Sequence, residues 1–219
     1  LQVSASRARR TLDHLGSGPS IIDGGRDTYR LRLGPGDVLD WQLFERAADL
    51  ALDQVPPSVA LLERARSLWT GEPLPEERYS DWAESWSARL VDRCIEVLAA
   101  LVGAYEREAD HVSAVRVARE LVDLDPCDER AHRLLMAALA RLGRRSQALR
   151  QYLVCRRQLV DELGVEPSEQ TSALYTAILA GRQPPIDTVH LAGARRRDRQ
   201  RHAPPASAPE ALRSDVPRG

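Results

Sequence analysis

The chain has 219 residues, of which 43% are hydrophobic, enough to form one large core or two small ones. Its 31 basic residues nearly balance 32 acidic ones, and every basic residue is arginine. The lack of lysine excludes a Walker A phosphate loop. No apolar run approaches the roughly 18 residues that predict a membrane span, and no signal peptide is expected.

The charge is unevenly distributed along the chain. Residues 1–39 contain six arginines against four aspartates, and residues 182–219 contain eight arginines against four acidic residues. Residues 40–181 contain 17 arginines against 24 acidic residues. Basic ends around an acidic middle predict that a polyanion would be contacted at the ends.

The first 15 residues have the pattern of an amphipathic helix. Apolar side chains recur at spacings of three and four, at Leu1, Ala5, Ala8, Leu12 and Leu15. The opposite side of this helix carries Val3, Arg7, Arg10 and His14, with Ser6 and Arg9 on one flank. The outward face is therefore predicted to be basic.

A β-hairpin is predicted next. After the break at Gly16–Ser20, two isoleucines precede a polar tip at residues 23–27, and Tyr29–Leu33 alternates apolar and polar residues. Arg26 is expected at the tip of this hairpin.

The segments Val3–Leu12 and Tyr29–Leu31 resemble the recognition helix and the wing of a winged helix-turn-helix domain of the response-regulator type. The resemblance implies contacts to double-stranded DNA from Val3, Ser4, Arg7, Arg9, Arg10 and Arg26. It also implies that the start of that domain precedes Leu1. Ala8 departs from the leucine usual in the family. An ordinary amphipathic helix and hairpin is the alternative.

The following region is predicted to be helical and to have its own packing centre. Asp40 is a candidate N-cap, Pro56-Pro57-Ser58 ends this helix and opens another that runs to about Trp69, and a long helix starts near Trp82. The four tryptophans lie close together in sequence, at residues 41, 69, 82 and 86.

A 34-residue repeat then dominates the chain. The matching positions are Leu101 and Leu135, Tyr105 and Leu139, Ala114 and Ala148, and Leu121 and Cys155. This period resembles tetratricopeptide repeats, in which two antiparallel helices stack on the next pair. Breaks are expected near Asp110, Asp125-Pro126 and Gly143, and the last long helix should be capped by Gly164.

From Asp37 to Leu179 the chain is similar to the bacterial transcriptional activator domain of actinobacterial antibiotic-pathway regulators. The motifs that carry the likeness are Gly36–Asp40 with Phe44, Leu68–Leu74, Asp81–Ala83, Glu129–Met136, Gly143–Leu149 with Tyr152, and Glu162–Ser168. The resemblance implies an activator that binds promoter direct repeats, recruits RNA polymerase, self-associates on DNA and controls secondary-metabolite genes. Such a regulator is expected in the cytoplasm.

We therefore expect a mainly α fold with three parts. Residues 1–36 would be the end of a winged helix domain, residues 37–181 a tetratricopeptide-like activator domain, and residues 182–219 a disordered tail rich in Arg, Pro and Ala. The arginines between residues 195 and 201 would touch nucleic acid nonspecifically or lie in a solvated tail.

The sequence offers no pattern of catalytic chemistry. Its five histidines and three cysteines lack metal-ligand spacing, and no nucleophile elbow is present, so we predict no metal, no cofactor and no enzyme. His132 is expected to be a core or rim residue, and Cys94, Cys127 and Cys155 structural thiols, mostly on apolar helix faces. The alternative function is a helical scaffold that binds other proteins without specific DNA binding.

Overall fold

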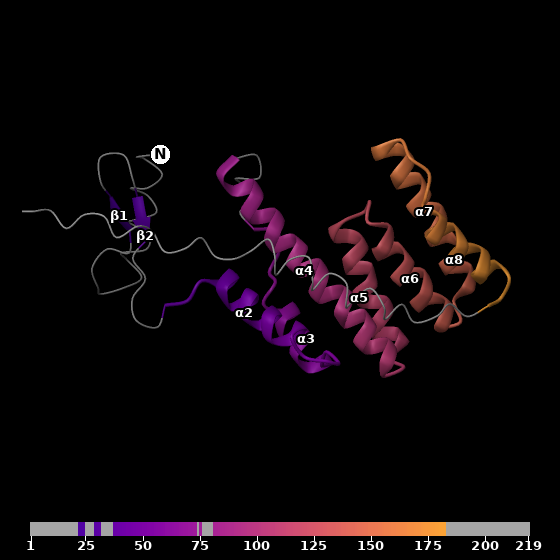
Figure 1. Cartoon of the computed structure of the whole chain (residues 1–219), viewed down its shortest axis with the longest axis horizontal. Helices are drawn as coiled ribbons and strands as arrows, with labels where there is room; N and C mark the ends of the chain where they lie inside the picture. Colours follow the sequence, from indigo (N-terminus) through magenta and orange to yellow (C-terminus); the bar gives the residue numbers. More distant parts are fainter. Residues whose placement is uncertain (1–21, 25–28, 32–36, 74, 76–80, 183–219) are drawn as a thin grey trace, which may run out of the picture.

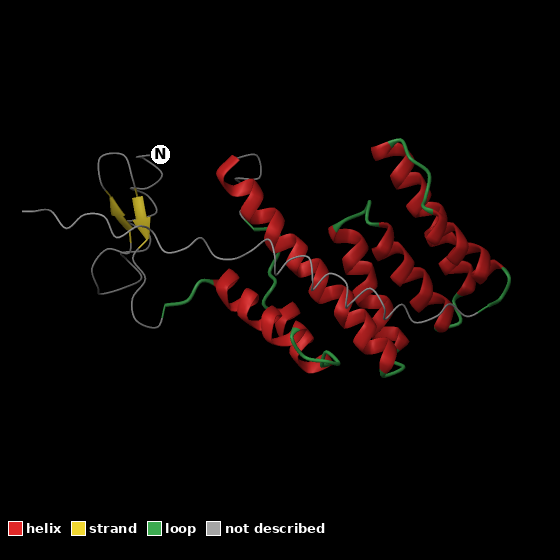
Figure 2. Cartoon of the chain, in the orientation of Figure 1, coloured by secondary structure: helices red, strands yellow, loops and turns green. Residues whose placement is uncertain are grey.

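The protein is described by a computed structural model that covers residues 22–24, 29–31, 37–73, 75 and 81–182. Within these residues the fold is a series of helices preceded by one short hairpin (Figure 2). The predicted helix over residues 1–15 and the predicted disordered tail lie outside the described residues.

The hairpin pairs β1 (Ile22–Gly24) with β2 (Tyr29–Leu31) in antiparallel register. Ile22 lies opposite Leu31, and Gly24 lies opposite Tyr29. The predicted hairpin is therefore confirmed, with pairing that extends two residues into the segment expected to be its polar tip. Its identification as the wing of a DNA-binding domain stays a prediction.

The helices form one continuous stack (Figure 1). They are α2 (Asp40–Leu52), α3 (Val59–Ser67), α4 (Asp81–Arg107), α5 (His111–Leu124), α6 (Glu129–Arg141), α7 (Arg145–Leu163) and α8 (Glu169–Leu179). Helices α2, α4, α6 and α8 contact one another in series, and α3, α5 and α7 each pack between two of them in sequence. This alternation of inner and outer helices is the arrangement of a tetratricopeptide-like solenoid.

The 34-residue repeat corresponds to the buried faces of two helix pairs. All four matched positions are buried in both copies: Leu101 and Leu135, Tyr105 and Leu139, Ala114 and Ala148, and Leu121 and Cys155. Ala114 and Ala148 have no exposed surface, because a neighbouring helix lies directly against each of them. The predicted repeat is confirmed.

Most helix ends follow the predicted breaks. The carboxylate of Asp110 accepts a hydrogen bond from the Ser113 N–H at 3.0 Å and caps α5. Gly164 ends α7 in the left-handed conformation, with φ of +69°, which glycine adopts without the steric penalty of a Cβ.

Two predicted boundaries of α2 are wrong. Asp40 is the first helical residue and not the N-cap, a position that Leu39 occupies without a side-chain bond. The Asp40 carboxylate instead accepts from the Trp41 N–H at 2.8 Å. At the other end α2 stops at Leu52, before the prolines, because the chain already turns at Asp53.

The tryptophans pack as two aromatic pairs at the first helices. Trp41 of α2 meets Trp86 of α4 edge to face, with ring centroids 5.7 Å apart, and Phe44 meets Trp69 at 5.2 Å. Trp41, Trp69 and Trp86 are partly buried against the main core, so this region extends that core and is not a separate one. The side chain of Trp82 lies outside the described residues.

Truncation of the repeat core should be costly. Leu101 has no exposed surface, so Leu101→Ala would leave a cavity and is expected to lower the free energy of unfolding by about 2–5 kcal/mol. Urea unfolding followed by circular dichroism measures this change. The control Leu153→Ala, at a side chain 53% exposed, should change it by roughly 0.5 kcal/mol or less. Equal losses for the two variants would contradict the packing described.

Candidate functional site

The predicted DNA contacts are not among the described residues. Val3, Ser4, Arg7, Arg9, Arg10 and Arg26 all fall in the undescribed segments. Their mutual geometry therefore stays a prediction. The charged and polar groups that the structure does describe lie on the helices of the repeats.

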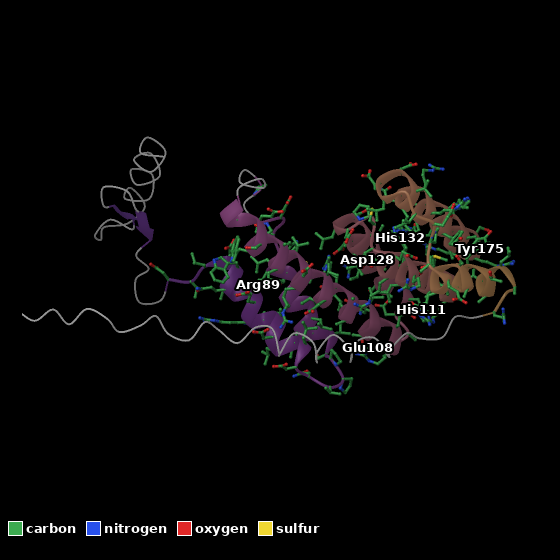
Figure 3. All side chains as sticks on the ribbon, turned by 45° about the horizontal axis from the view of Figure 1, so that its top comes forward. Arg89, Glu108, His111, Asp128, His132 and Tyr175 are labelled. Carbon is green, nitrogen blue, oxygen red and sulfur yellow. The ribbon has the colours of Figure 1, made fainter. Side chains whose placement is uncertain are left out.

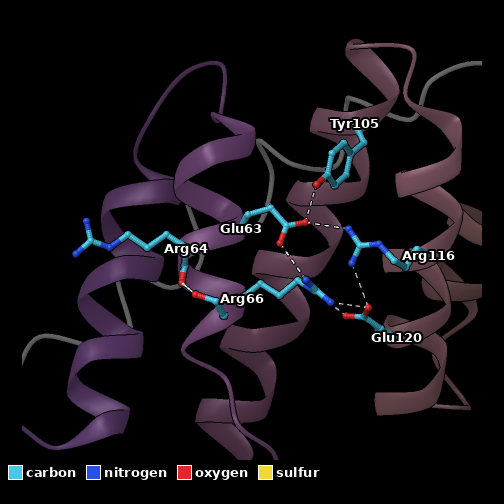
Figure 4. Close-up of polar contacts among 7 residues, drawn as sticks. Glu63, Arg64, Arg66, Tyr105, Arg116 and Glu120 are labelled. Carbon is cyan, nitrogen blue, oxygen red and sulfur yellow. Dashed lines mark hydrogen bonds and ion pairs between the residues drawn. The ribbon is translucent and has the colours of Figure 1, made fainter.

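Helix α3 is joined to α4 and α5 by a group of charged and polar side chains that we call the α3–α5 clamp (Figure 4). Its members are Glu63, Arg66, Tyr105, Arg116 and Glu120. Arg66 donates two hydrogen bonds to the Glu120 carboxylate, at 2.7 and 2.8 Å, and one to Glu63 at 2.9 Å. Glu63 also accepts from the Tyr105 hydroxyl at 2.6 Å and from Arg116 at 3.1 Å.

The clamp stabilises the charged forms of Glu63 and Arg66. Burial alone would raise the pKa of Glu63, but the hydrogen bonds from Tyr105, Arg66 and Arg116 outweigh it, and the net pKa is lowered. The hydrogen bonds to Glu120 raise the pKa of the Arg66 guanidinium. Paired charges thus join α3 to α5, and the Tyr105 hydroxyl joins α3 to α4, which fixes the position of α3 on the repeats.

Beside the clamp lies an open groove of about 490 Å³ between α3 and α5. The α4 residues at its base, Cys94 and Leu98, have little exposed surface. The lining includes Trp69, Cys94, Leu98 and Asp123. Burial raises the pKa of the Cys94 thiol to about 12, so this cysteine is protonated at neutral pH and behaves as an apolar group.

A second charged group lies at the junction of α4, α5 and α6. Glu106 is only 5% exposed, yet its carboxylate accepts from the Arg141 guanidinium at 2.5 Å and lies 3.3 Å from the His111 ring. Figure 3 shows His111 near this junction. Sequence reasoning missed this pair, although the position of Glu106 directly after the apolar run Val97–Tyr105 was a signal of a buried partner.

His132 is a fully buried structural residue, as predicted. One ring nitrogen, Nε2, lies 2.9 Å from the Pro126 carbonyl oxygen and therefore donates to it, which leaves Nδ1 to accept from the Gln151 amide at 2.8 Å. His132, labelled in Figure 3, lies 34 residues after Leu98 in the sequence. The same place in the repeat thus holds a leucine in one copy and a bonded histidine in the other.

The described residues contain no cluster suited to a metal. No group of three or more His, Cys, Asp or Glu side chains comes together in the described ranges. Cys94 and Cys155 are buried on helices as predicted, whereas Cys127 is partly buried in the turn before α6. No helix in the described part of the chain is long and apolar enough to cross a bilayer.

The outward side of α7 is the most apolar exposed surface of the repeats. Leu153, Val154, Val160 and Leu163 of α7, with Val165 just beyond it, are all 42–58% exposed. Leu153 and Val160 line a shallow groove of about 360 Å³ with Arg156, Arg157, Asp161 and Glu166. The six residues of this groove, together with Leu163 and Val165, are called the α7 outer face below.

One edge of the α7 outer face is fixed by an ion pair. The guanidinium of Arg156 donates two hydrogen bonds to the Glu166 carboxylate, at 2.5 and 2.7 Å, so the loop after Gly164 is held against the helix. By contrast, Arg157 and Asp161 form no ion pair with any residue in the described ranges. The sequence pattern predicted that this helix would be long and apolar on one side, but it predicted neither the ion pair nor the exposed surface.

Stacked helix pairs with polar ties between them define a helical repeat protein of the tetratricopeptide-like class. Residues 39–179 match the family described as bacterial transcriptional activator domain, which is more than half of the chain. The protein belongs to this family.

Curated relatives of similar sequence are named as regulators. Transcriptional regulator RedD of Streptomyces coelicolor is 30% identical over 82% of this chain and 53% of its own length. Regulatory protein DnrI of Streptomyces peucetius is 30% identical over 80% of this chain and 65% of its own. Regulatory protein AfsR of Streptomyces coelicolor is 33% identical over 80% of this chain but 18% of its own. The chain spans less than two thirds of each.

The fold recurs in a solved structure. EmbR of Mycobacterium tuberculosis, solved in complex with a low-affinity phosphopeptide, superposes with a TM-score of 0.67 at 21% identity. The match covers 92% of this chain and 55% of EmbR. The predicted mainly α, tetratricopeptide-like fold class is confirmed.

The contribution of the clamp to stability should depend on pH. Because the pKa of Glu63 is lowered in the folded state, its contribution is present above the unfolded value near 4.5 and is lost as the pH falls through the folded value. Glu63→Gln should lower the free energy of unfolding at pH 7 by about 1 kcal/mol, allowing for solvent screening.

Chemical denaturation at pH 7 and at pH 3 measures this difference, which should shrink at the lower pH. Glu84→Gln, at an exposed glutamate of α4 outside the clamp, is the matched control and should be nearly neutral at both. A Glu63→Gln effect that was the same at both pH values would show that the charge of Glu63 is not what stabilises the clamp.

Proposed function

We propose that this protein is a DNA-binding transcriptional activator that controls a biosynthetic gene cluster for a secondary metabolite. The observation that carries the proposal is the family match over residues 39–179, because the domain is described as one of transcriptional activators. The relatives' names as regulators support it. We place the protein in the cytoplasm, where its DNA target and the transcription machinery are found, and assign it no enzymatic activity.

DNA contact is assigned to residues 1–36, which we interpret as the end of a winged helix domain. Arg7 would make a bidentate contact with guanine in the major groove, and Val3 would contact a thymine methyl group. Ser4, Arg9, Arg10 and Arg26 would hold phosphates or the adjacent groove. The hairpin of β1 and β2, which flanks position 26, supports this assignment.

The helical domain, residues 37–181 in this proposal, would contact other proteins. Its partners would be RNA polymerase and neighbouring copies of the protein bound to direct repeats of the promoter. The acidic balance of residues 40–181 makes this part unsuited to a DNA backbone, which supports a role away from the nucleic acid. Residues 182–219 are assigned to a tail.

The second candidate is a scaffold that binds proteins through the repeats without specific DNA binding. The exposed apolar residues of α7 favour it, since exposed apolar surface marks interaction sites. Fluorescence anisotropy of the protein on duplexes from its own promoter region, across a salt series, separates the two. Tighter binding to repeat-bearing than to scrambled DNA, with an affinity that falls steeply as the salt concentration rises, supports the activator. Weak binding that shows no preference between the two duplexes supports the scaffold.

The two arginines of the predicted recognition helix should behave differently. Arg7→Ala is expected to lose about 1–3 kcal/mol of binding free energy and to relax base preference at one position of the site. Arg10→Ala should weaken binding to all sequences alike and reduce the salt slope by about one.

Anisotropy titrations on a set of single-base operator variants measure both effects. Arg46→Ala, at an exposed arginine of α2 outside the predicted DNA contacts, is the control and should bind as the unchanged protein does. Identical behaviour of Arg7→Ala and Arg10→Ala across all operator variants would refute the assigned roles.

A further inference from the structure

We propose that the α7 outer face is a self-association surface, on which two copies of this chain pair α7 against α7 in antiparallel orientation about a two-fold axis near Val160. The proposal rests on the exposed apolar side chains of α7 and on the order of charges along it. It names a surface for self-association and therefore deepens the proposed function.

The first observation is the position of these side chains on the helix. Leu153 and Val160 are seven residues apart, and Arg157 lies between them on the same side, opposite the buried Cys155 and Leu159. Seven-residue spacing is that of helices packed against one another along a seam. No other described helix covers this side, because α7 meets α6 and α8 through its remaining sides.

The second observation is the length and placement of α7. It has 19 residues against 14 in α5, its counterpart in the preceding repeat. Leu159–Leu163 is the added part, and α7 lies at the end of the stack (Figure 1). Val160 and Leu163 belong to this added end and Val165 follows it, whereas Leu153 lies within the repeat, so the extension enlarges an apolar surface that begins in the repeat.

The order of charges favours a second copy as the occupant. Arg157 and Asp161 lie four residues apart on one flank of the seam, and neither is paired within the described residues. An antiparallel two-fold near Val160 brings Arg157 of each copy against Asp161 of the other, and Leu153 toward Leu163 and Val165 of the other. A closed two-fold contact needs such a self-complementary patch. In a parallel pairing the same flank of the two copies would lie on opposite sides of the seam, so Arg157 of one copy would not meet Asp161 of the other.

The α7 outer face is already ordered for such a contact. The double hydrogen bond from Arg156 to Glu166 satisfies that edge within each copy, so neither charge is left unpaired when the surface is covered. A contact of this kind loses little conformational freedom on association.

Sedimentation velocity of the whole 219-residue chain, without DNA and across a concentration series, tests the proposal. The unchanged protein should show a concentration-dependent dimer. Val160→Glu should raise the dimer dissociation constant at least about tenfold, because it places two carboxylates at the axis. Val112→Glu, at a valine 63% exposed on α5, is the matched control and should leave the dimer unchanged. Far-UV circular dichroism should show equal helix content in both variants.

The antiparallel pairing is tested by exchange of the charges. Arg157→Asp and Asp161→Arg should each weaken the dimer several-fold, and the double exchange should restore it, because the two opposite charges meet again. A protein that is monomeric throughout the series overturns the proposal, as does a dimer that Val160→Glu leaves intact. Failure of the double exchange to restore the dimer overturns the antiparallel pairing.

The failure of this inference is distinguishable from failure of the proposed function. Promoter anisotropy with Val160→Glu on a single repeat reports DNA recognition by one copy, independently of the α7 contact. Sequence-specific DNA binding without a dimer would refute only the α7 pairing. A dimer that binds DNA without any sequence preference would instead refute the activator function and leave the α7 pairing supported.

Discussion

The close approach of successive helices is the constraint on which the rest of this structure depends. It is set by small side chains at the places where helices cross, above all Ala114 and Ala148, which are completely buried. A larger side chain at either place would push the helices of a pair apart and uncover the leucines that fill the core. Because each pair buries its apolar side only against the next, the stack is stable as a whole.

Charged side chains fix how the first helices sit on this stack. The contacts of Glu63 and Arg66 with residues of α4 and α5 give α3 one defined position, which apolar packing alone would leave less specified. Glu106 and Arg141 do the same at the junction of the next helices, where both are nearly buried. Buried ion pairs add little net stability, but an unpaired partner is costly, so they disfavour alternative arrangements.

The end of the stack has a different character from its interior. Like α3 and α5, α7 packs between two inner helices, but it extends beyond the length of the repeat and presents leucine and valine side chains to solvent. Repeat proteins usually close their ends with polar surface. The departure at α7 is what makes this end a candidate for contact with another chain. The groove beside α3, by comparison, has an apolar floor and charges that are already paired within the clamp.

The sequence by itself determined the repeat, its register and its main breaks. A 34-residue spacing of apolar residues, alanines at two matched places and Gly164 at a helix end are local signals, and local signals are readable without the fold. The family followed from motifs of the same kind. The predicted contacts of Arg7 and Arg26 lie in segments that the structure does not describe, so they stay predictions of the sequence alone.

Only the tertiary structure decided which charged residues are paired and which apolar residues stay uncovered. Arg66 and Glu120 are 54 residues apart, and no pattern in the sequence predicts that two turns of helix so far apart will face each other. Leu153 has the same residue type and helical setting as many core leucines, yet it is exposed because no helix among the described residues covers that side of α7. The physical reason is that pairing and burial depend on the packing of whole helices against one another, whereas periodicity reports only which side of one helix is apolar.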